Sequence, residues 1–149
     1  MRVFVTGATG FIGSRIVPEL IGAGHAVLGM TRSAEGAKAL VAAGAASHMA
    51  SLEDLPAIMA GAAEADAVIH TAFDHDFSRF VESCGKDGRV IEAIGSVLKG
   101  SDRPLLVTSG VGMGDADDGK PASEEVFNLH HPNPRIATNS PLSGSWRTA

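Results

Sequence analysis

Short apolar runs alternate with amphipathic segments along the first 110 residues of the chain. Runs that are apolar at nearly every position are typical of strands buried on both faces of a parallel sheet. The pattern predicts strands at residues 2–6, 25–30, 46–50, 67–70 and 104–108. It predicts helices at residues 11–23, 34–43, 51–61 and 77–98, with Ser51 as the N-cap of the third helix.

Strands and helices that alternate at this spacing imply right-handed βαβ crossovers, and therefore a parallel sheet with helices on both faces. We predict an α/β fold with a doubly wound parallel sheet in the strand order 3-2-1-4-5, numbered along the chain. Ligands bind such sheets at the carboxyl ends of the strands, where the strand order reverses. Here that place is the crevice between the first and fourth strands.

The regular pattern ends after Gly110. Between there and the last residue only residues 124–129 have a helical pattern, and residues 139–149 have no period. We therefore predict one nucleotide-binding domain at residues 1–138, with a sheet that is incomplete at its C-terminal end. Residues 139–149 are predicted to form an irregular tail.

Three glycines lie between the first strand and the first helix, at positions 7, 10 and 13. Gly7 lets the chain turn tightly, Gly10 lets the backbone approach a pyrophosphate, and Gly13 lets the helix pack close to the strand. The helix N-terminus adds N–H groups and a positive dipole end. The loop predicts a dinucleotide site made of Gly7, Thr9, Gly10, Phe11, Ile12 and Gly13. A glycine-rich turn without a ligand is the alternative.

Arg32 and Ser33 follow the second strand, about 20 residues beyond the glycine loop, where the ribose of the cofactor is selected. An acidic residue there binds the 2′-hydroxyl of NAD. A guanidinium can instead fork onto the 2′-phosphate of NADP, and a serine hydroxyl can add a donor. We predict NADP as the cofactor, with NAD, or a merely solvated Arg32, as the alternatives.

Residues 6–13, Thr-Gly-Ala-Thr-Gly-Phe-Ile-Gly, resemble the fingerprint of the extended and atypical short-chain dehydrogenases/reductases, also called the NAD-dependent epimerase/dehydratase family. The resemblance covers residues 1–138, about half of a usual member, and implies a three-layer Rossmann fold. It implies that Leu52 lines the adenine pocket, although Leu52 fits a plain core position equally well. It also implies that Thr71, Ala72 and Phe73 flank the nicotinamide ribose.

The resemblance further assigns Ser109 as the residue that hydrogen-bonds the reacting carbonyl. It implies hydride transfer between NADP(H) and a carbonyl or alcohol substrate. Classical members use a tyrosine as general acid, and this sequence contains no tyrosine. Because the tyrosine and the C-terminal substrate-binding part of the family are both missing, we expect little or no turnover from this chain alone. A non-catalytic NADP(H)-binding sensor and an inactive fragment stay open as alternatives. His70 and His75 are more often structural than catalytic at such a strand end.

Further segments resemble an atypical subgroup described as 3-beta-hydroxysteroid-dehydrogenase-like, whose members often lack the tyrosine as well. These segments are residues 11–14, 51–55, 68–73, 75–78 and 100–110. The fit ends near Ala137 and Thr138, where the composition changes. This change motivates the hypothesis that the chain is truncated or frameshifted there.

Composition excludes several classes of function. The formal net charge of −5 argues against nucleic-acid binding. The apolar runs are too short to span a bilayer and no signal peptide precedes them, so we predict no membrane contact and a cytoplasmic location. The single cysteine, Cys84, also fits a reducing compartment. No metal site is predicted, because His130 and His131 have no partner at ligand spacing. The expected partner is a small-molecule substrate, and self-association into a homo-oligomer stays open.

Overall fold

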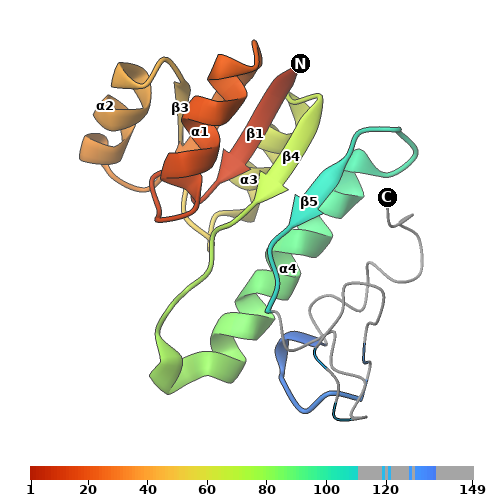
Figure 1. The fold of residues 1–149 in the computed structure, drawn as a ribbon. Helices are drawn as coiled ribbons and strands as arrows, with labels where there is room; N and C mark the ends of the chain where they lie inside the picture. The colour runs from red at the N-terminus through yellow and green to blue at the C-terminus, as the bar shows by residue number, and fades with distance from the viewer. Residues whose placement is uncertain (111–118, 120, 122–127, 129, 137–149) are drawn as a thin grey trace.

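The chain is built around a five-stranded parallel sheet in the order β3-β2-β1-β4-β5 (Figure 1). The computed structural model describes residues 1–110, 119, 121, 128 and 130–136. The strands are β1 (Arg2–Thr6), β2 (Ala26–Thr31), β3 (Ala46–Met49), β4 (Ala67–His70) and β5 (Leu105–Val107). The helices are α1 (Gly13–Gly22), α2 (Ala34–Ala42), α3 (Leu55–Ala63), η1 (Phe77–Arg79) and α4 (Phe80–Leu98). The predicted doubly wound fold and strand order are confirmed.

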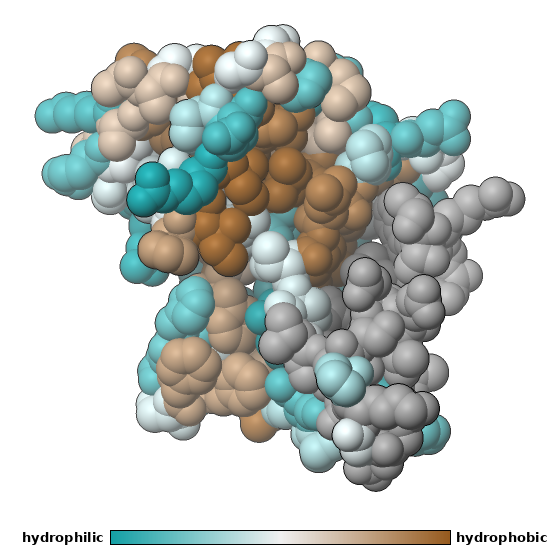
Figure 2. Space-filling model, viewed as in Figure 1, coloured by the Kyte–Doolittle hydropathy of each residue, from teal (hydrophilic) through white to brown (hydrophobic). Residues whose placement is uncertain are grey.

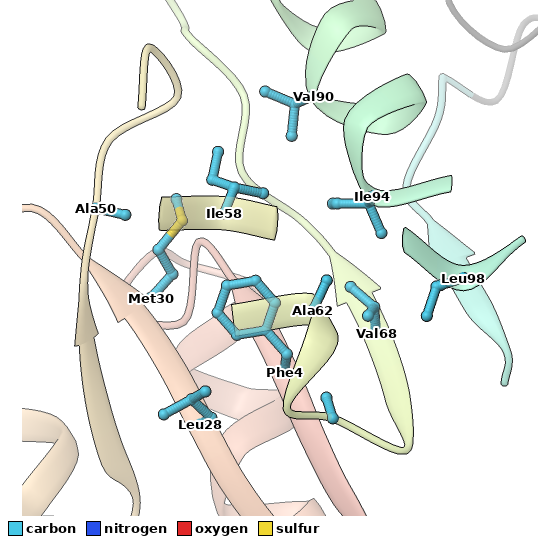
Figure 3. Close-up of a cluster of buried hydrophobic side chains, with 11 residues drawn as sticks. Phe4, Leu28, Met30, Ala50, Ile58, Ala62, Val68, Val90, Ile94 and Leu98 are labelled. Carbon is cyan, nitrogen blue, oxygen red and sulfur yellow. The ribbon is translucent and has the colours of Figure 1, made fainter. Parts of the chain in front are cut away.

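Helices cover both faces of the sheet (Figure 1). Successive side chains of β1 point to opposite faces, so Phe4 faces α3 and α4 whereas Val3 and Val5 face α1 and α2. The cluster on the first face comprises Phe4, Leu28, Met30, Ala50, Ile58, Ala62, Ala65, Val68, Val90, Ile94 and Leu98 (Figure 3). The cluster on the second face comprises Val3, Val5, Ala8, Val17, Val27, Leu40, Ala45 and Ala67.

The ring of Phe4 is the centre of the first cluster (Figure 3). It is fully buried, and α3 lies directly on it because residue 61 is a glycine. A Cβ atom at Gly61 would lie 2.6 Å from Cζ of Phe4. This close approach places β1, and the loop that follows it, rigidly between the two helical layers.

Two helices begin later than predicted. Residues 7–12 form turns, the first of which is closed by the amide of Gly10 donating to the carbonyl of Gly7 at 2.9 Å, so α1 begins at Gly13. The N-cap of α3 is Asp54, whose Oδ1 accepts from the amide of Ala57 at 3.1 Å. The prediction of Ser51 as this cap was wrong, because its hydroxyl accepts from the nearer amide of Glu53 at 3.3 Å.

The predicted helix at residues 77–98 divides into the 3₁₀ turn η1 and α4. Asp76 caps η1 by accepting from the amide of Ser78 at 3.1 Å, and α4 runs without a break through Gly85 and Gly88. The predicted helix at 124–129 and the tail at 139–149 lie outside the described residues. Over the part of the chain that the structure describes, no helix has the length and hydropathy needed to cross a membrane.

Candidate functional site

The glycine loop after β1 has a backbone that larger residues could not adopt. Gly7 has a φ of +65°, and a Cβ there would lie 2.8 Å from the amide nitrogen of Ala72. A Cβ at Gly13 would lie 2.1 Å from the carbonyl oxygen of Gly7. At Gly10 a Cβ would meet only that same carbonyl, at 3.2 Å, so the rest of its surroundings is open. The loop therefore folds tightly on itself and leaves bare backbone facing outward.

A cleft of about 570 Å³ opens beside this loop, at the carboxyl ends of the strands. It lies where the strand order reverses, between β1 and β4, as the sequence predicts. Twelve predicted residues line it: Gly7, Thr9, Gly10, Phe11, Ile12, Gly13, Arg32, Leu52, Thr71, Ala72, Phe73 and Ser109. Leu52 also packs against the core cluster around Phe4, so both sequence interpretations of this residue describe part of its surroundings.

Arg32 and Ser33 differ in where their side chains lie. Arg32 is exposed and lines the cleft just beyond the end of β2. Ser33 does not line the cleft, and its hydroxyl oxygen caps α2 by accepting from the amide of Gly36 at 3.0 Å. The cap uses the oxygen lone pairs, so the hydroxyl proton can still be donated outward.

The loop after β4 is tied to the end of β1 through Thr6. The hydroxyl of Thr6 accepts from the amides of Thr71 at 3.2 Å and Ala72 at 3.3 Å. The hydroxyl of Thr71 donates in turn to the carbonyl of Thr6 at 2.7 Å. These bonds hold one wall of the cleft in register with the glycine loop, which forms the other wall.

A buried polar network continues from Thr6 into the protein. With its oxygen accepting two amides, the Thr6 hydroxyl directs its own proton to Nδ1 of His70, 2.7 Å away. We therefore assign the proton of the His70 ring to Nε2, which donates to Oδ1 of Asp87 at 3.0 Å. Oδ2 of Asp87 accepts from Nη2 of Arg135 at 3.0 Å. His70 and Asp87 are each 1% exposed or less, so the carboxylate is held almost entirely by these two partners.

The sequence predicted neither Asp87 nor Arg135 as a site residue. The signal for Asp87 was present, because it interrupts the apolar stripe of α4 formed by Cys84, Ile91 and Ile94. A carboxylate in such a stripe needs a buried partner. Arg135 gave no such signal, yet it lines the cleft, donates to the carbonyl of Thr108 at 3.1 Å and lies 4.3 Å over the ring of Phe73.

Lys86 of α4 joins two loops across the cleft. Its ammonium group lies 2.6 Å from Oε1 of Glu53, after β3, and 2.7 Å from Oδ2 of Asp74, after β4. The hydrogen bond from Lys86 lowers the pKa of each of these carboxyl groups, and hydrogen bonds from both carboxylates raise the pKa of Lys86. All three residues line the cleft, so this bridge ties the loop after β3 to the loop after β4 within the cleft lining.

Replacing Lys86 by methionine should return the pKa values of Glu53 and Asp74 toward the ordinary carboxyl range. Because the folded-state pKa values are lowered, the interaction stabilises the fold above that range and is lost as the pH falls through the lowered values. Carboxyl carbon titrations by NMR measure both groups. Lys38→Met, on the exposed side of α2, is the charge-matched control. Unchanged titrations in Lys86→Met would contradict the bridge.

Ser109 lies beyond β5 and lines the cleft as an exposed residue. The adjacent Thr108 is fixed by its amide and hydroxyl, which donate to the carbonyl of His70 at 3.0 Å and 3.2 Å. The exposed His75 lines the cleft as well. Among the described residues, no group of three or more His, Cys, Asp or Glu side chains is arranged to hold a metal ion.

Comparison with known proteins adds to this geometry. The model of the family "NAD dependent epimerase/dehydratase family" matches residues 3–111. "Uncharacterized protein C2A9.02" of Schizosaccharomyces pombe is 58% identical over 109 residues, which cover 73% of this chain and 37% of that protein. "Uncharacterized protein YLL056C" of Saccharomyces cerevisiae is 44% identical over 112 residues, covering 74% and 38%. The chain thus spans less than two fifths of the length of either relative.

Among solved structures, the fold is similar to that of UDP-glucose 4-epimerase from Thermus thermophilus, which was determined in complex with NAD. The two superpose with a TM-score of 0.69 at 25% sequence identity. The similarity covers 96% of this chain and 49% of the epimerase chain. The part of this chain that is matched includes its parallel sheet and the glycine loop.

Proposed function

Because this chain belongs to the NAD-dependent epimerase/dehydratase family, we propose that its cleft binds NADP(H) and serves hydride transfer between that cofactor and a small carbonyl or alcohol compound. The observation that carries the proposal is the glycine cradle at the edge of the 570 Å³ cleft. Side chains at Gly7 or Gly13 would strike backbone atoms within 2.8 Å, so the loop is shaped for bare backbone beside the cleft. The NAD complex of the similar epimerase supports a dinucleotide there.

The residues around the loop fit a pyrophosphate. The first N–H groups of α1 have no acceptor within the helix and carry a partial positive charge, which favours an anion. Phe11 and Ile12 precede this helix end, line the cleft and are exposed. We expect their amides, with that of Gly13, to donate to the phosphate oxygens, whereas the amide of Gly10 is already bound to the carbonyl of Gly7.

Arg32 supports NADP rather than NAD. Its guanidinium is exposed at the cleft, in the place where an acidic residue would bind the ribose of NAD. A guanidinium forks onto a phosphate with two parallel hydrogen bonds. The Ser33 hydroxyl, whose oxygen caps α2, would donate its proton to the same phosphate.

The other predicted residues line the remaining length of the cleft. Leu52 would contact the adenine, and the backbone of Thr71, Ala72 and Phe73 would flank the nicotinamide ribose. Ser109 would donate a hydrogen bond to the substrate oxygen and so orient the carbonyl. When bound, NADPH supplies the hydride, and the chain positions the acceptor.

A second candidate function is a non-catalytic NADP(H) sensor. It is favoured by the sequence itself, which has no tyrosine to serve as general acid. The sensor and the oxidoreductase share the same cofactor cleft and differ in turnover. NADPH consumption with a panel of ketones and aldehydes separates them, because a sensor binds NADPH tightly and consumes none.

The melting temperature of the purified chain should rise more with NADPH than with NADH. Ligand at about 100 times its dissociation constant adds roughly 2.7 kcal/mol to the free energy of unfolding. That increment corresponds to a shift of roughly 10 °C for a domain of this size. In Arg32→Ala the shifts with the two cofactors should become similar, because the 2′-phosphate loses its partner.

Arg15→Ala is the matched control for this experiment, since Arg15 is an exposed arginine on α1 that does not line the cleft. It should keep the preference for NADPH. Equal shifts with both cofactors in the wild-type chain would refute the role of Arg32. No shift with either cofactor would refute the dinucleotide site.

A further inference from the structure

Four aromatic rings gather at the mouth of the cleft, where the loop after β4 enters η1 and α4. They belong to Phe73, His75, Phe77 and Phe80, and we call them the aromatic rim. Phe73 lies edge-on to His75 at 5.5 Å and to Phe80 at 6.1 Å, measured between ring centroids. Phe77 stacks on Phe80 at 5.9 Å and lies edge-on to His75 at 6.0 Å. The rings therefore form one continuous surface.

The aromatic rim is open to a ligand on its outer side and continuous with the cleft on its inner side. Phe77 is 69% exposed and the neighbouring Val81 is 72% exposed. Figure 2 shows hydrophobic side chains over this part of the molecule, below the body of the sheet. Phe73 and His75 belong both to the rim and to the cleft lining, which also includes Ser109. A molecule held near Ser109 can thus extend over the rim.

The charges at this end of the cleft disfavour a phosphorylated substrate. Lys86 is bound by Glu53 and Asp74, and Arg135 is bound by Asp87. On the outer side, Arg79 forms a two-fold ion pair with Glu82. A diphosphate placed here would compete with a carboxylate for each of these cations, whereas a neutral ring would leave the pairs intact.

We propose that the aromatic rim binds the flat, apolar ring system of an uncharged carbonyl substrate. This inference rests on the proposed function, since it names the substrate class of the same cleft. The rim rings contact one another at centroid distances of 5.5–6.1 Å, at which aromatic groups attract one another, and a substrate ring laid on their outer side would make contacts of the same kind. Burial of the exposed ring of Phe77 under a substrate ring adds the hydrophobic contribution. The sugar and diphosphate of a nucleotide sugar gain neither of these contributions, and the diphosphate would have to compete with the carboxylates that bind the nearby cations.

Calorimetric titration with 2-acetonaphthone, an aromatic ketone that does not form a stable adduct with lysine, tests the proposal in the NADPH-loaded chain. In Phe77→Ala the dissociation constant should rise about fivefold, which is the effect of one aromatic pair. Phe77 is so exposed that this change leaves the fold intact. Val41→Ala, which removes an equally exposed apolar side chain from α2, should leave the dissociation constant unchanged.

UDP-glucose is the competing probe. It should bind more weakly than 2-acetonaphthone and with the same affinity in wild type and Phe77→Ala. If UDP-glucose binds more tightly than 2-acetonaphthone, or if the ketone binds equally well to wild type and Phe77→Ala, the proposed role of the aromatic rim is contradicted. The same titration without cofactor separates the two proposals. If NADPH does not raise the melting temperature but the ketone still binds in a way that depends on Phe77, the cofactor site is contradicted and the role of the aromatic rim is not.

Discussion

Replacing Gly13 by alanine should disrupt the glycine loop that borders the cleft and abolish cofactor binding. The new Cβ would lie 2.1 Å from the carbonyl oxygen of Gly7 and 2.7 Å from Cα of Ala8. Both are backbone atoms, so the clash is relieved only if the loop moves away from α1. We expect a loss of about 3 kcal/mol in the free energy of unfolding, at the upper end for overpacked sites. Urea unfolding and the NADPH-induced melting shift measure the two effects.

Gly22→Ala is the matched control, because it makes the same chemical change in the same helix. A Cβ at Gly22 meets no atom within 4 Å. The free energy of unfolding of Gly22→Ala should equal that of the wild-type chain or exceed it by up to about 1 kcal/mol, since alanine has a higher helix propensity than glycine. A Gly13→Ala chain that is as stable as Gly22→Ala and still binds NADPH would show that the loop is not constrained as described.

Replacing Asp87 by alanine should destabilise the chain by about 3–5 kcal/mol, the cost of removing one partner from a buried ion pair. The change leaves the Nε2 proton of His70 and the guanidinium of Arg135 without the carboxylate that both contact. Asp87→Asn should cost less, because the amide keeps the shape and one acceptor oxygen. Thermal and urea unfolding measure these differences.

The exposed pair of Arg79 and Glu82 provides the comparison for Asp87. Both of its side chains are more than half exposed, so Glu82→Ala should change the free energy of unfolding far less than Asp87→Ala does. Comparable losses in Asp87→Ala and Glu82→Ala would contradict the description of Asp87 as the centre of a buried network. Unchanged cofactor binding in a folded Asp87→Ala chain would show that the network does not shape the cleft wall.

The sequence was sufficient to predict the features that depend on local pattern. The apolar runs located the strands, their alternation with helices predicted the doubly wound strand order, and the offsets of Gly7, Gly10 and Gly13 located the loop that borders the cleft. The cap of α3 was missed because Ser51 and Asp54 are both good cap residues three positions apart. Choosing between them required knowing that the chain turns once more after β3.

The cleft features that escaped prediction join residues far apart in the chain. Lys86 and Glu53 are 33 positions apart, and Arg135 and Asp87 are 48 apart. Periodicity describes which face of a helix is apolar, but it carries no information on which distant charge a carboxylate meets. The aromatic rim was missed for a different reason, because its rings are close in the sequence and only the path of the loop into η1 brings Phe73 against Phe80.

The position of β1 in the middle of the sheet has a consequence during synthesis of the chain. β1 leaves the ribosome before the other four strands of the sheet, yet its contact from Thr6 to His70 spans 64 positions. At the usual translation rates the apolar strand waits roughly 3–13 seconds before β4 emerges to cover its second edge. During that interval Val3, Phe4 and Val5 are accessible to chaperones and to other nascent strands. The residues that anchor the finished fold are therefore the ones most exposed to misassembly while the chain is being made.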